Sequence, residues 1–291
     1  MEIAFHIGAN CTDEDRLLKS ILKNGEVLSA HRVKAPGPSR YRRLIRETIQ
    51  NLNGMPPAED TRQILLEAII DDDMPRRLVL SNPNFICISN RIFDGGMLYQ
   101  QAEFKIQSLL GLFPEDRVEL HLALRNPATF LPDVFREAKF PDLDTFLHGM
   151  APQDIRWSDL VRRIRACAPQ AQLTVWCNED TPLLWADLIR ELCGLDPMTR
   201  ITGGFDLLAS IMAPEGMARF LNYLRSHPPR NDLQKRRVIA AFLDKYALEE
   251  EVEETVDLPG FTGELVDHLT DLYEQDVATI AAMPDVDFIA P

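Results

Sequence analysis

The chain has 291 residues, of which 45% are hydrophobic and 26% are charged, with 14 glycines and 20 prolines. This composition excludes a disordered, collagen-like or disulfide-framework protein, and the length is sufficient for a large core. The sequence contains no apolar run near the roughly 18 residues that a membrane helix needs, and residues 1–6 lack the blocks of a secretion signal. We therefore expect a soluble, cytoplasmic protein with no membrane partner.

The charge of the chain is strongly negative and unevenly distributed. Lys and Arg number 31 against 45 Asp and Glu, a net charge of -14, which argues against nucleic acid as a partner. Residues 1–150 carry 18 basic and 21 acidic side chains, whereas residues 151–291 carry 13 and 24, so an anion site is expected in the first part. The five cysteines have no spacing suited to zinc, which predicts reduced thiols and no metal site.

The first predicted strand opens the chain and ends at a glycine. Residues 3–5 are apolar, and Gly8 follows at a turn, which is typical of a short buried strand. A helix is expected next, with Thr12 as its N-cap and the carboxylates of residues 13–15 in its first turn, where the helix dipole favours them. Apolar residues at helical spacing continue the pattern, and we expect the helix to end at Gly25.

Strands and helices alternate along the first two thirds of the chain. Strands are predicted at residues 78–80, from Val118 and at residues 172–180, and helices at residues 41–52, 99–112 and 159–166. Such spacing indicates βαβ crossovers and a mainly parallel sheet. Further helices are predicted at residues 205–212, 217–224, 233–246 and 265–282. We therefore predict one α/β domain over residues 1–291: a sheet flanked by helices in residues 1–197, and a mainly helical C-terminal portion in residues 198–291.

The predicted sheet brings four positions to one edge. Gly8, Ser81, Arg125 and Glu179 each lie at the carboxyl end of a predicted strand. Open α/β sheets gather ligands at that edge. A binding site is therefore expected there.

Two charged segments each have two interpretations. Residues 31–46 suit either a solvated helix face beside a basic loop or an anion-recruiting mouth. Their basic side chains are Arg32, Lys34, Arg40, Arg42, Arg43 and Arg46. The acidic stretch at residues 249–254 suits either a solvated connection or a partner-binding segment.

Five segments share their order and character with one known family. They are FHIGANCTDEDRLLKSIL, LVLSNPNF, HLALRNPATFL, TVWCNED and the tail LTDLYEQDVATIAAMPDVDFIAP. The first resembles the opening HIGxHKTGTTxLQ of bacterial sulfotransferases of the P-loop type. The resemblance implies a P-loop NTPase-like fold, 3'-phosphoadenosine 5'-phosphosulfate as cofactor and a small molecule or carbohydrate as acceptor. It assigns the cofactor's 5' side to Gly8, Ala9, Asn10, Cys11 and Thr12, and its 3'-phosphate to Arg125.

Several residues depart from the family's pattern and leave the expected site more acidic. The loop lysine is Cys11 here, the Gly-Thr-Thr after it is Asp-Glu-Asp at residues 13–15, and the serine eight residues after Arg125 is Asp133; a carboxylate in the turn after LVLS is Pro83. Sulfuryl transfer depends on positive charge aimed at the transferring oxygens. Losing one such contact costs about 2.7–4 kcal/mol, so we expect weak or lost transfer and weak cofactor binding.

Two functions from different classes follow. The first is a sulfotransferase with Arg125 on the 3'-phosphate, residues 8–12 on the 5' side and no assigned catalytic residue. The second is a non-catalytic binding or interaction module that keeps only the fold. Cys11 at a helix N-terminus also suits a nucleophile, with His6 as its base, whereas His6 and His121 also suit places packed within the sheet.

Overall fold

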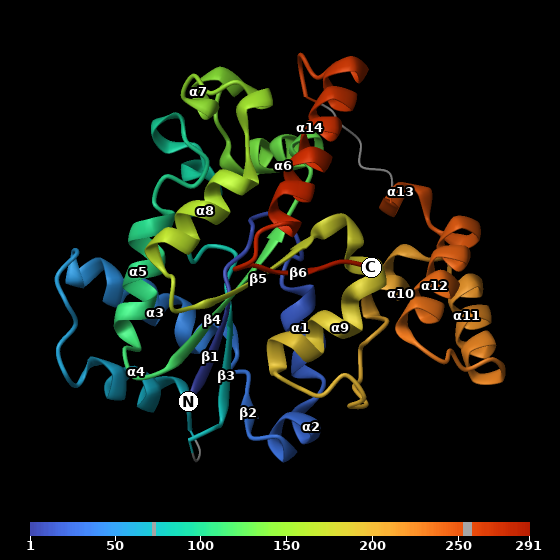
Figure 1. Ribbon diagram of the computed structural model, residues 1–291, viewed down its shortest axis with the longest axis horizontal. Coiled ribbons are helices and arrows are strands. Elements are labelled where there is room, and N and C mark those ends of the chain that lie inside the picture. Colours follow the sequence, from blue (N-terminus) through green and yellow to red (C-terminus); the bar gives the residue numbers. More distant parts are fainter. Residues whose placement is uncertain (72–73, 253–257) are drawn as a thin grey trace.

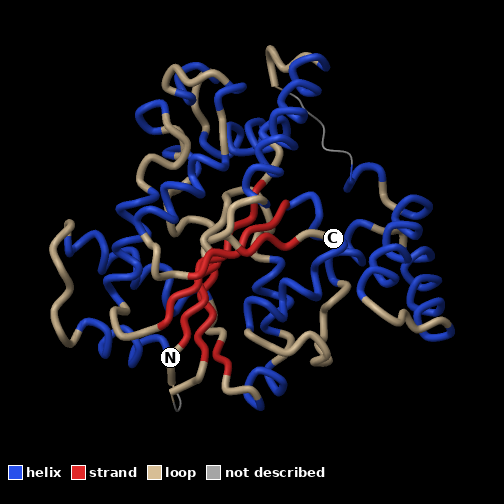
Figure 2. Tube along the Cα trace, viewed as in Figure 1, coloured by secondary structure: helices blue, strands red, loops and turns tan. Residues whose placement is uncertain are grey.

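The computed structural model describes residues 1–71, 74–252 and 258–291. It shows an α/β fold around a six-stranded sheet, drawn in red in Figure 2. The strands are β1 Glu2–His6, β2 Val33–Lys34, β3 Arg77–Ser81, β4 Arg117–Leu124, β5 Gln172–Cys177 and β6 Asp287–Ile289. They lie in the order β2-β3-β1-β4-β5-β6, and every adjacent pair is parallel. The predicted α/β class with a parallel sheet is confirmed.

Helices cover both faces of the sheet (Figure 1). Their bounds are α1 Arg16–Leu22, α2 Gly25–Ala30, α3 Pro38–Leu52, α4 Thr61–Ile69, α5 Ala102–Leu112, α6 Pro127–Ala138, α7 Leu143–Leu147, α8 Trp157–Cys167, α9 Thr181–Cys193, α10 Asp206–Ile211, α11 Pro214–Ser226, α12 Asp232–Tyr246, α13 Glu249–Val252 and α14 Gly263–Ala281. Helices α1, α2 and α9 pack on one face, whereas α3 to α6, α8 and α14 pack on the other. Helices α10, α11 and α12 enclose an apolar cluster of their own beside α9. Short 3-10 turns include η1 Ser89–Arg91 and η4 Asn178–Asp180.

Strands β1, β3, β4 and β5 are buried on both faces, which explains their almost continuous apolar sequences. In β4, Leu120 and Leu122 belong to the larger apolar cluster, whereas Ala123 belongs to the smaller cluster beneath α9. This alternation is the one that a strand's geometry imposes. Across the described residues, no helix combines the length and the hydrophobicity that crossing a lipid bilayer demands.

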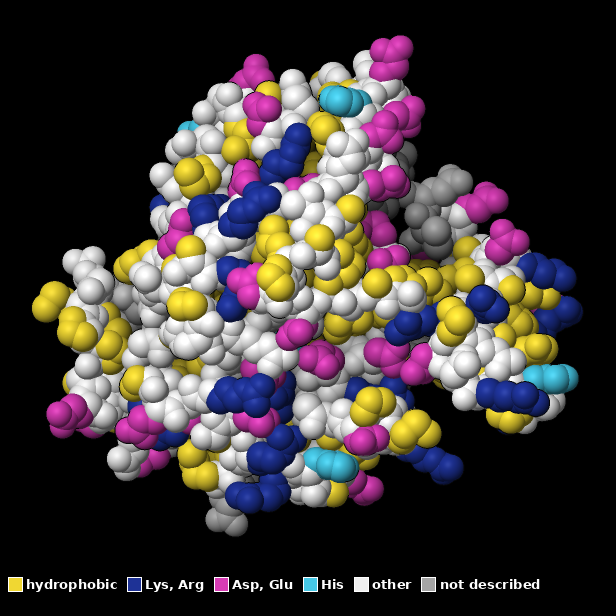
Figure 3. Space-filling model, in the orientation of Figure 1, with side chains coloured by type: hydrophobic (Ala, Val, Ile, Leu, Met, Phe, Trp, Pro, Cys, Tyr) yellow, Lys and Arg dark blue, Asp and Glu magenta, His cyan; other side chains and the backbone are white. Residues whose placement is uncertain are grey.

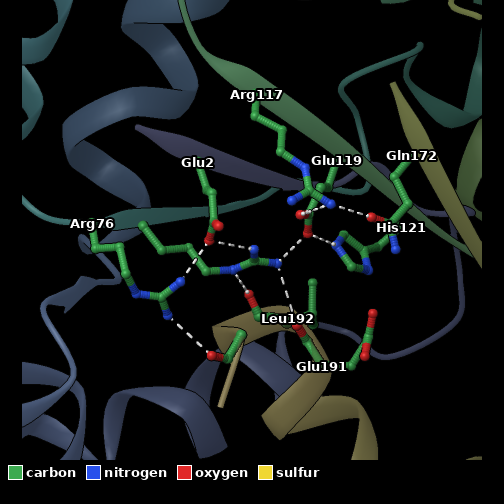
Figure 4. A network of polar contacts seen from close by, with 10 residues as sticks. Glu2, Arg76, Arg117, Glu119, His121, Gln172, Glu191 and Leu192 are labelled. Atoms are coloured by element: carbon green, nitrogen blue, oxygen red, sulfur yellow. Dashed lines mark hydrogen bonds and ion pairs between the residues drawn. The ribbon is translucent and has the colours of Figure 1, made fainter. Parts of the chain in front are cut away.

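A buried polar network joins the beginnings of the strands to the end of α9 (Figure 4). The Arg77 guanidinium is its centre: Nη2 donates to Glu119 Oε2 at 2.5 Å and Nη1 donates to Glu2 Oε2 at 3.2 Å. Arg77 Nε donates to the carbonyl oxygen of Leu192 on α9 at 2.9 Å. The network pairs the buried charges of Arg77 and Glu119, which would be costly to bury alone.

Two histidines lie side by side within the sheet. His6 of β1 is in register with His121 of β4, and both side chains are buried. His6 Nδ1 lies 2.9 Å from Ser81 Oγ, and its ring stacks on Trp176 with centroids 5.7 Å apart. His121 has no hydrogen-bond partner at either ring nitrogen among the described residues. The expected packing of both histidines in the sheet is confirmed, whereas the expected hydrogen-bond satisfaction of His121 is not found among the described residues. Burial lowers the pKa of each histidine.

Several element boundaries differ from those predicted. The first helix begins at Arg16 rather than after Thr12, and Gly25 begins α2 rather than ending α1. Strands β2 and β6 were not predicted, because two or three residues are too few to show an apolar pattern. The mainly helical C-terminal portion thus returns to the sheet through β6, and α14 packs against α6 and α8. Of the acidic stretch, residues 249–252 form α13, while residues 253–254 lie outside the described residues.

Candidate functional site

A cleft of about 610 Å³ opens at the carboxyl ends of β1, β4 and β5. Cys11 and Thr12 from the loop after β1, Arg125 after β4 and Glu179 after β5 all line it. Trp185 of α9 lies in its wall as well. The structure therefore brings three of the strand ends singled out in the sequence into one concave site, as expected for an open α/β sheet.

Three of the residues assigned to the cofactor loop do not line the cleft. Gly8, Ala9 and Asn10 are buried behind it. Gly8 has φ +118°, and a Cβ atom there would lie 3.2 Å from the Pro83 carbonyl oxygen, so the turn requires glycine. The three residues thus shape the loop, and their assignment to the cofactor stays a prediction.

Asn10 is fixed by partners from distant parts of the chain. The Tyr99 hydroxyl donates to Asn10 Oδ1 at 2.7 Å, and it accepts from the Asn10 backbone N–H at 3.1 Å. Asn10 Nδ2 donates to Asn84 Oδ1 at 2.8 Å. The hydrogen-bonding capacity of this loop residue is thus largely satisfied within the protein.

The predicted N-cap at Thr12 is wrong. The Thr12 hydroxyl donates to the Ala9 carbonyl oxygen at 2.8 Å, which closes a turn before the helix. The side chain of Asp13 instead accepts from the backbone N–H of Leu17 at 3.1 Å. The carboxylate of Asp13 therefore satisfies one of the N–H groups at the start of α1, a position where an N–H can otherwise bind an external anion.

The backbone explains why the helix begins late. Cys11, Glu14 and Asp15 have φ of 53°, 49° and 64°, a left-handed conformation that residues with a side chain seldom adopt and a right-handed helix excludes. Asp15 is held there by Arg42, whose Nη1 and Nη2 donate to its two carboxylate oxygens at 2.9 and 2.5 Å. These hydrogen bonds lower the pKa of Asp15.

Cys11, which the resemblance aligns with the loop lysine of sulfotransferases, supplies no positive charge. Its thiol donates to Glu137 Oε2 at 3.1 Å. Burial raises the pKa of Cys11, and the hydrogen bond and charge of Glu137 raise it further. The thiol therefore stays protonated at neutral pH, contrary to what a nucleophilic cysteine requires.

Arg125 reaches the cleft but is engaged within the protein. Its Nη2 lies 2.6 Å from Asp133 Oδ2 of α6, and its Nη1 donates to the Cys11 carbonyl oxygen at 2.5 Å. The indole N–H of Trp157 donates to the Arg125 carbonyl oxygen at 2.9 Å, which fixes the backbone at the strand end. Only 7% of the Arg125 side chain is exposed. A carboxylate of the chain itself thus neutralises the expected phosphate-binding cation.

Glu179 links the end of β5 to two other elements. Its Oε1 accepts from the backbone N–H of Asn126 at 2.7 Å, and its Oε2 accepts from the Tyr273 hydroxyl at 3.0 Å. Burial raises the pKa of Tyr273, and the charge of Glu179 raises it further, so the phenol remains a donor. This carboxylate joins β4, β5 and α14 around the cleft.

The cleft has an excess of negative charge. Arg16 and Arg125 are the basic residues in its wall among the described residues, and Arg16 Nη2 lies 3.4 Å from Glu14 Oε2. The acidic residues of the wall are Asp13, Glu14, Asp133, Glu179 and Glu251. Five carboxylates against two guanidiniums disfavour a bound anion. The described residues also contain no group of three or more His, Cys, Asp or Glu arranged to hold a metal ion.

The basic segment at residues 31–46 does not converge on the cleft. Arg42 faces the loop after β1 through Asp15, whereas Arg40 is bonded to Asp71 and Arg43 Nε donates to Glu47 at 2.9 Å. Arg46 lines a different cavity. On the face drawn in Figure 3, Lys and Arg side chains gather around β2 and its neighbouring turn.

Comparison with known proteins adds no assignment. No protein-family model matches the chain, and no curated protein matches its sequence. The geometry and charge of the site are therefore the basis for a proposal about function.

The sequence analysis did not identify the residues whose side chains bond the buried side of the loop after β1. Tyr99 and Asn84 bind Asn10, and Glu137 accepts from both Cys11 and Ser89. These partners lie more than 70 residues from the loop in the sequence. Asp133 carried a signal, because it replaces the serine that the resemblance leads one to expect.

Proposed function

We propose that this protein is sulfotransferase-like, of P-loop fold, with weak or lost transfer of a sulfuryl group from 3'-phosphoadenosine 5'-phosphosulfate. The parallel sheet, Gly8 after β1 and Arg125 after β4 support this kinship. The main observation that supports weak or lost transfer is the 2.6 Å ion pair between Arg125 and Asp133. The carboxylate of Asp133 replaces the phosphate as the partner of the guanidinium.

Binding of the nucleotide would require this pair to separate. A phosphate that took over Arg125 would leave the Asp133 carboxylate beside it, in a cleft already rich in carboxylates. Like charges at such short range oppose each other strongly. The exchange is therefore unfavourable unless Asp133 turns toward Arg136, its second partner.

The transfer step would also lack its usual positive charge. Cys11 supplies a protonated thiol where the loop lysine is expected. Losing one contact to the developing charge costs about 2.7–4 kcal/mol. Such a loss slows transfer by roughly a hundred- to a thousandfold, at about 1.36 kcal/mol for each factor of ten.

A non-catalytic binding or interaction module that keeps only the fold is the second candidate. The structural roles of Asp13 and Asp15 favour it, because one carboxylate satisfies the start of α1 and the other pairs with Arg42. The acidic replacements thus stabilise the loop without a nucleotide. In this case the small-molecule or carbohydrate acceptor implied by the resemblance has no role.

Isothermal titration calorimetry with 3'-phosphoadenosine 5'-phosphate separates these candidates. A dissociation constant of about 1 mM that Arg125→Ala abolishes supports a residual nucleotide site, whereas no heat in the wild type supports the module. The matched control is Arg162→Ala, which removes an arginine paired with Asp159 on α8 outside the cleft. Micromolar binding together with turnover of the sulfated donor at about 1 s⁻¹, an ordinary enzymatic rate, would contradict the proposal.

A further inference from the structure

A second cavity, of about 400 Å³, lies between α3, α5 and the turn after β3. Its wall includes Arg46 of α3, Asn84 and Ile88 of the turn, Arg91 of η1 and Lys105 of α5. No residue of this wall also lines the cleft at the strand ends. The cavity is therefore a separate feature of the molecule.

Among the described residues, the wall of this cavity contains three basic side chains and no acidic one, the reverse of the cleft. The ammonium group of Lys105 is half-buried and forms no ion pair with any described residue. In the part of the chain that the structure describes, the carboxylate paired with Arg46 is that of Glu47, at 3.9 Å. In a chain with a net charge of -14, such a concentration of positive charge in a concave site attracts anions.

The charges in this cavity act on one another. Burial lowers the pKa of Lys105, and the positive charge of Arg91 lowers it further. A bound anion would favour the charged form of Lys105 and offset this repulsion. Binding of a negatively charged ligand in this cavity would therefore be electrostatically favourable.

Arg91 is held in position within the wall. Its Nε forms an ion pair with Asp94 Oδ2 at 2.7 Å, which offsets part of its charge, so Arg46 and Lys105 are the cations of the wall with no carboxylate at hydrogen-bond distance among the described residues. With the Gln101 amide oxygen turned toward the Arg91 guanidinium, that oxygen accepts from Nη1 at 3.3 Å and from Nη2 at 2.5 Å. A guanidinium that is already ordered loses less entropy when it binds an oxyanion.

An apolar surface adjoins these charges. Ile88 is 51% exposed in the wall, beside the buried side chains of Ile86 and Cys87. Binding cavities for small molecules combine apolar surface with a few placed polar groups. We propose that this cavity binds an organic anion, with a phosphate or sulfate group held by Arg46, Arg91 and Lys105 and with its organic part against Ile88. The proposal is independent of the function proposed for the cleft.

Calorimetric titration with 4-nitrophenyl phosphate and 4-nitrophenyl sulfate tests the assignment, with inorganic phosphate and sulfate alongside. We expect the esters to bind wild-type protein with a dissociation constant of about 1 mM or lower. Arg46→Gln with Lys105→Gln weakens binding at least about tenfold, or about 1.4 kcal/mol. Lys105→Gln alone serves as a milder variant, and thermal melts monitored by circular dichroism establish that each variant folds.

Matched controls identify the site. Arg43→Gln, on the same helix but outside the cavity, leaves the affinity unchanged. Ile88→Ser weakens the esters and not the inorganic ions. Wild-type affinity in both Lys105 variants, or no heat with either ester at about 10 mM, overturns the proposal. Equal affinity for inorganic phosphate and its ester overturns the role of Ile88.

Discussion

Asp15 and Arg42, 27 residues apart, form a two-pronged ion pair that joins the loop after β1 to α3. Arg42 Nε also donates to the Ser81 carbonyl oxygen at the end of β3, at 2.9 Å. One guanidinium therefore ties together the carboxyl ends of two neighbouring strands. A cation of the chain itself therefore stabilises the acidic loop.

We predict that Asp15→Asn destabilises the protein by about 1.5–3 kcal/mol, the usual range for a hydrogen bond to a charged group. Urea denaturation measures this change. Glu47→Gln, which removes the exposed partner of Arg43, is the control and should cost less than about 0.5 kcal/mol. An equal and small effect of both substitutions would contradict a structural role for Asp15.

The same pair predicts a dependence on pH. The folded-state pKa of Asp15 is below its ordinary value of 3.8, so the unfolded chain binds its proton first as the pH falls. The stability that the carboxylate contributes is present above pH 3.8 and is lost as the pH drops through the lower, folded-state pKa. The difference in unfolding free energy between wild type and Asp15→Asn should therefore become smaller as the pH falls. A difference that stays constant down to about pH 2 would contradict the stabilising role of the Asp15 carboxylate.

Gly8 offers a test of the turn behind the cleft. Gly8→Ala should cost about 1–3 kcal/mol, because φ +118° strains any side chain and the new Cβ atom meets the Pro83 carbonyl oxygen. Gly111→Ala on α5 is the matched control, since open space surrounds that position. It should stabilise the protein by about 0.5–1 kcal/mol through better helix propensity. In chemical denaturation, the change in unfolding free energy should thus have opposite signs for Gly8→Ala and Gly111→Ala. The same sign for both variants would contradict the observed turn.

The network in Figure 4 predicts a large cost for removing its centre. Arg77→Met leaves the buried Glu119 carboxylate without its 2.5 Å partner, which should destabilise the fold by about 3–5 kcal/mol. Arg77→Met with Glu119→Gln should recover part of this loss, because the substitution removes a buried charge that would keep, among the described residues, only the 3.5 Å ion pair with Arg117. A double-mutant cycle measured by urea denaturation tests the coupling, and strict additivity would show that the two side chains act independently.

The buried histidines predict a loss of stability below neutral pH. The folded-state pKa values of His6 and His121 lie below 6.5, so the unfolded chain takes up more protons as the pH falls below that value. Each histidine can then cost up to about 1.36 kcal/mol per pH unit. Denaturation at about pH 7.5 and pH 5.5 should show this loss.

Charged groups near the two histidines also affect their protonation. Asp13, Asp15 and Arg42 act on His6, while Arg77 acts on His121, and Glu119 Oε2 lies 3.9 Å from His121 Nε2. His121→Leu removes one titrating group and leaves the others in place. The unfolding free energy of this variant should change less between those two pH values than that of wild type. An unchanged pH dependence would exclude His121 as a source of the loss of stability.

Much of the fold was predictable because its signals are local. The apolar run of β4 and the alternation of strands with helices along the first two thirds of the chain identified a parallel sheet. The start of α1 was not predictable, because Asp15 is drawn out of the helix by Arg42, a tertiary contact. β6 depends on its pairing with β5 for its existence and leaves little trace in three residues.

The location of the candidate site could be predicted from the sequence better than the contacts between its side chains. Arg125 and Glu179 were expected at the same edge of the sheet, and both line the cleft. The Arg125–Asp133 pair depends on how α6 leaves β4, a geometry that spacing alone does not specify. Asn10 was assigned to the cofactor on resemblance, whereas its contacts with Tyr99 arise only in the folded chain.

Calorimetry of Asp133→Ser with 3'-phosphoadenosine 5'-phosphate tests the central claim, that an internal carboxylate blocks a nucleotide site. The substitution removes the ion pair between Asp133 and Arg125, and we predict affinity at least about tenfold above wild type that is lost again when Arg125→Ala is added. Asp159→Ser, which removes an exposed aspartate paired with Arg162 outside the cleft, should change nothing. A folded Asp133→Ser variant that binds the nucleotide no better than wild type would contradict the account.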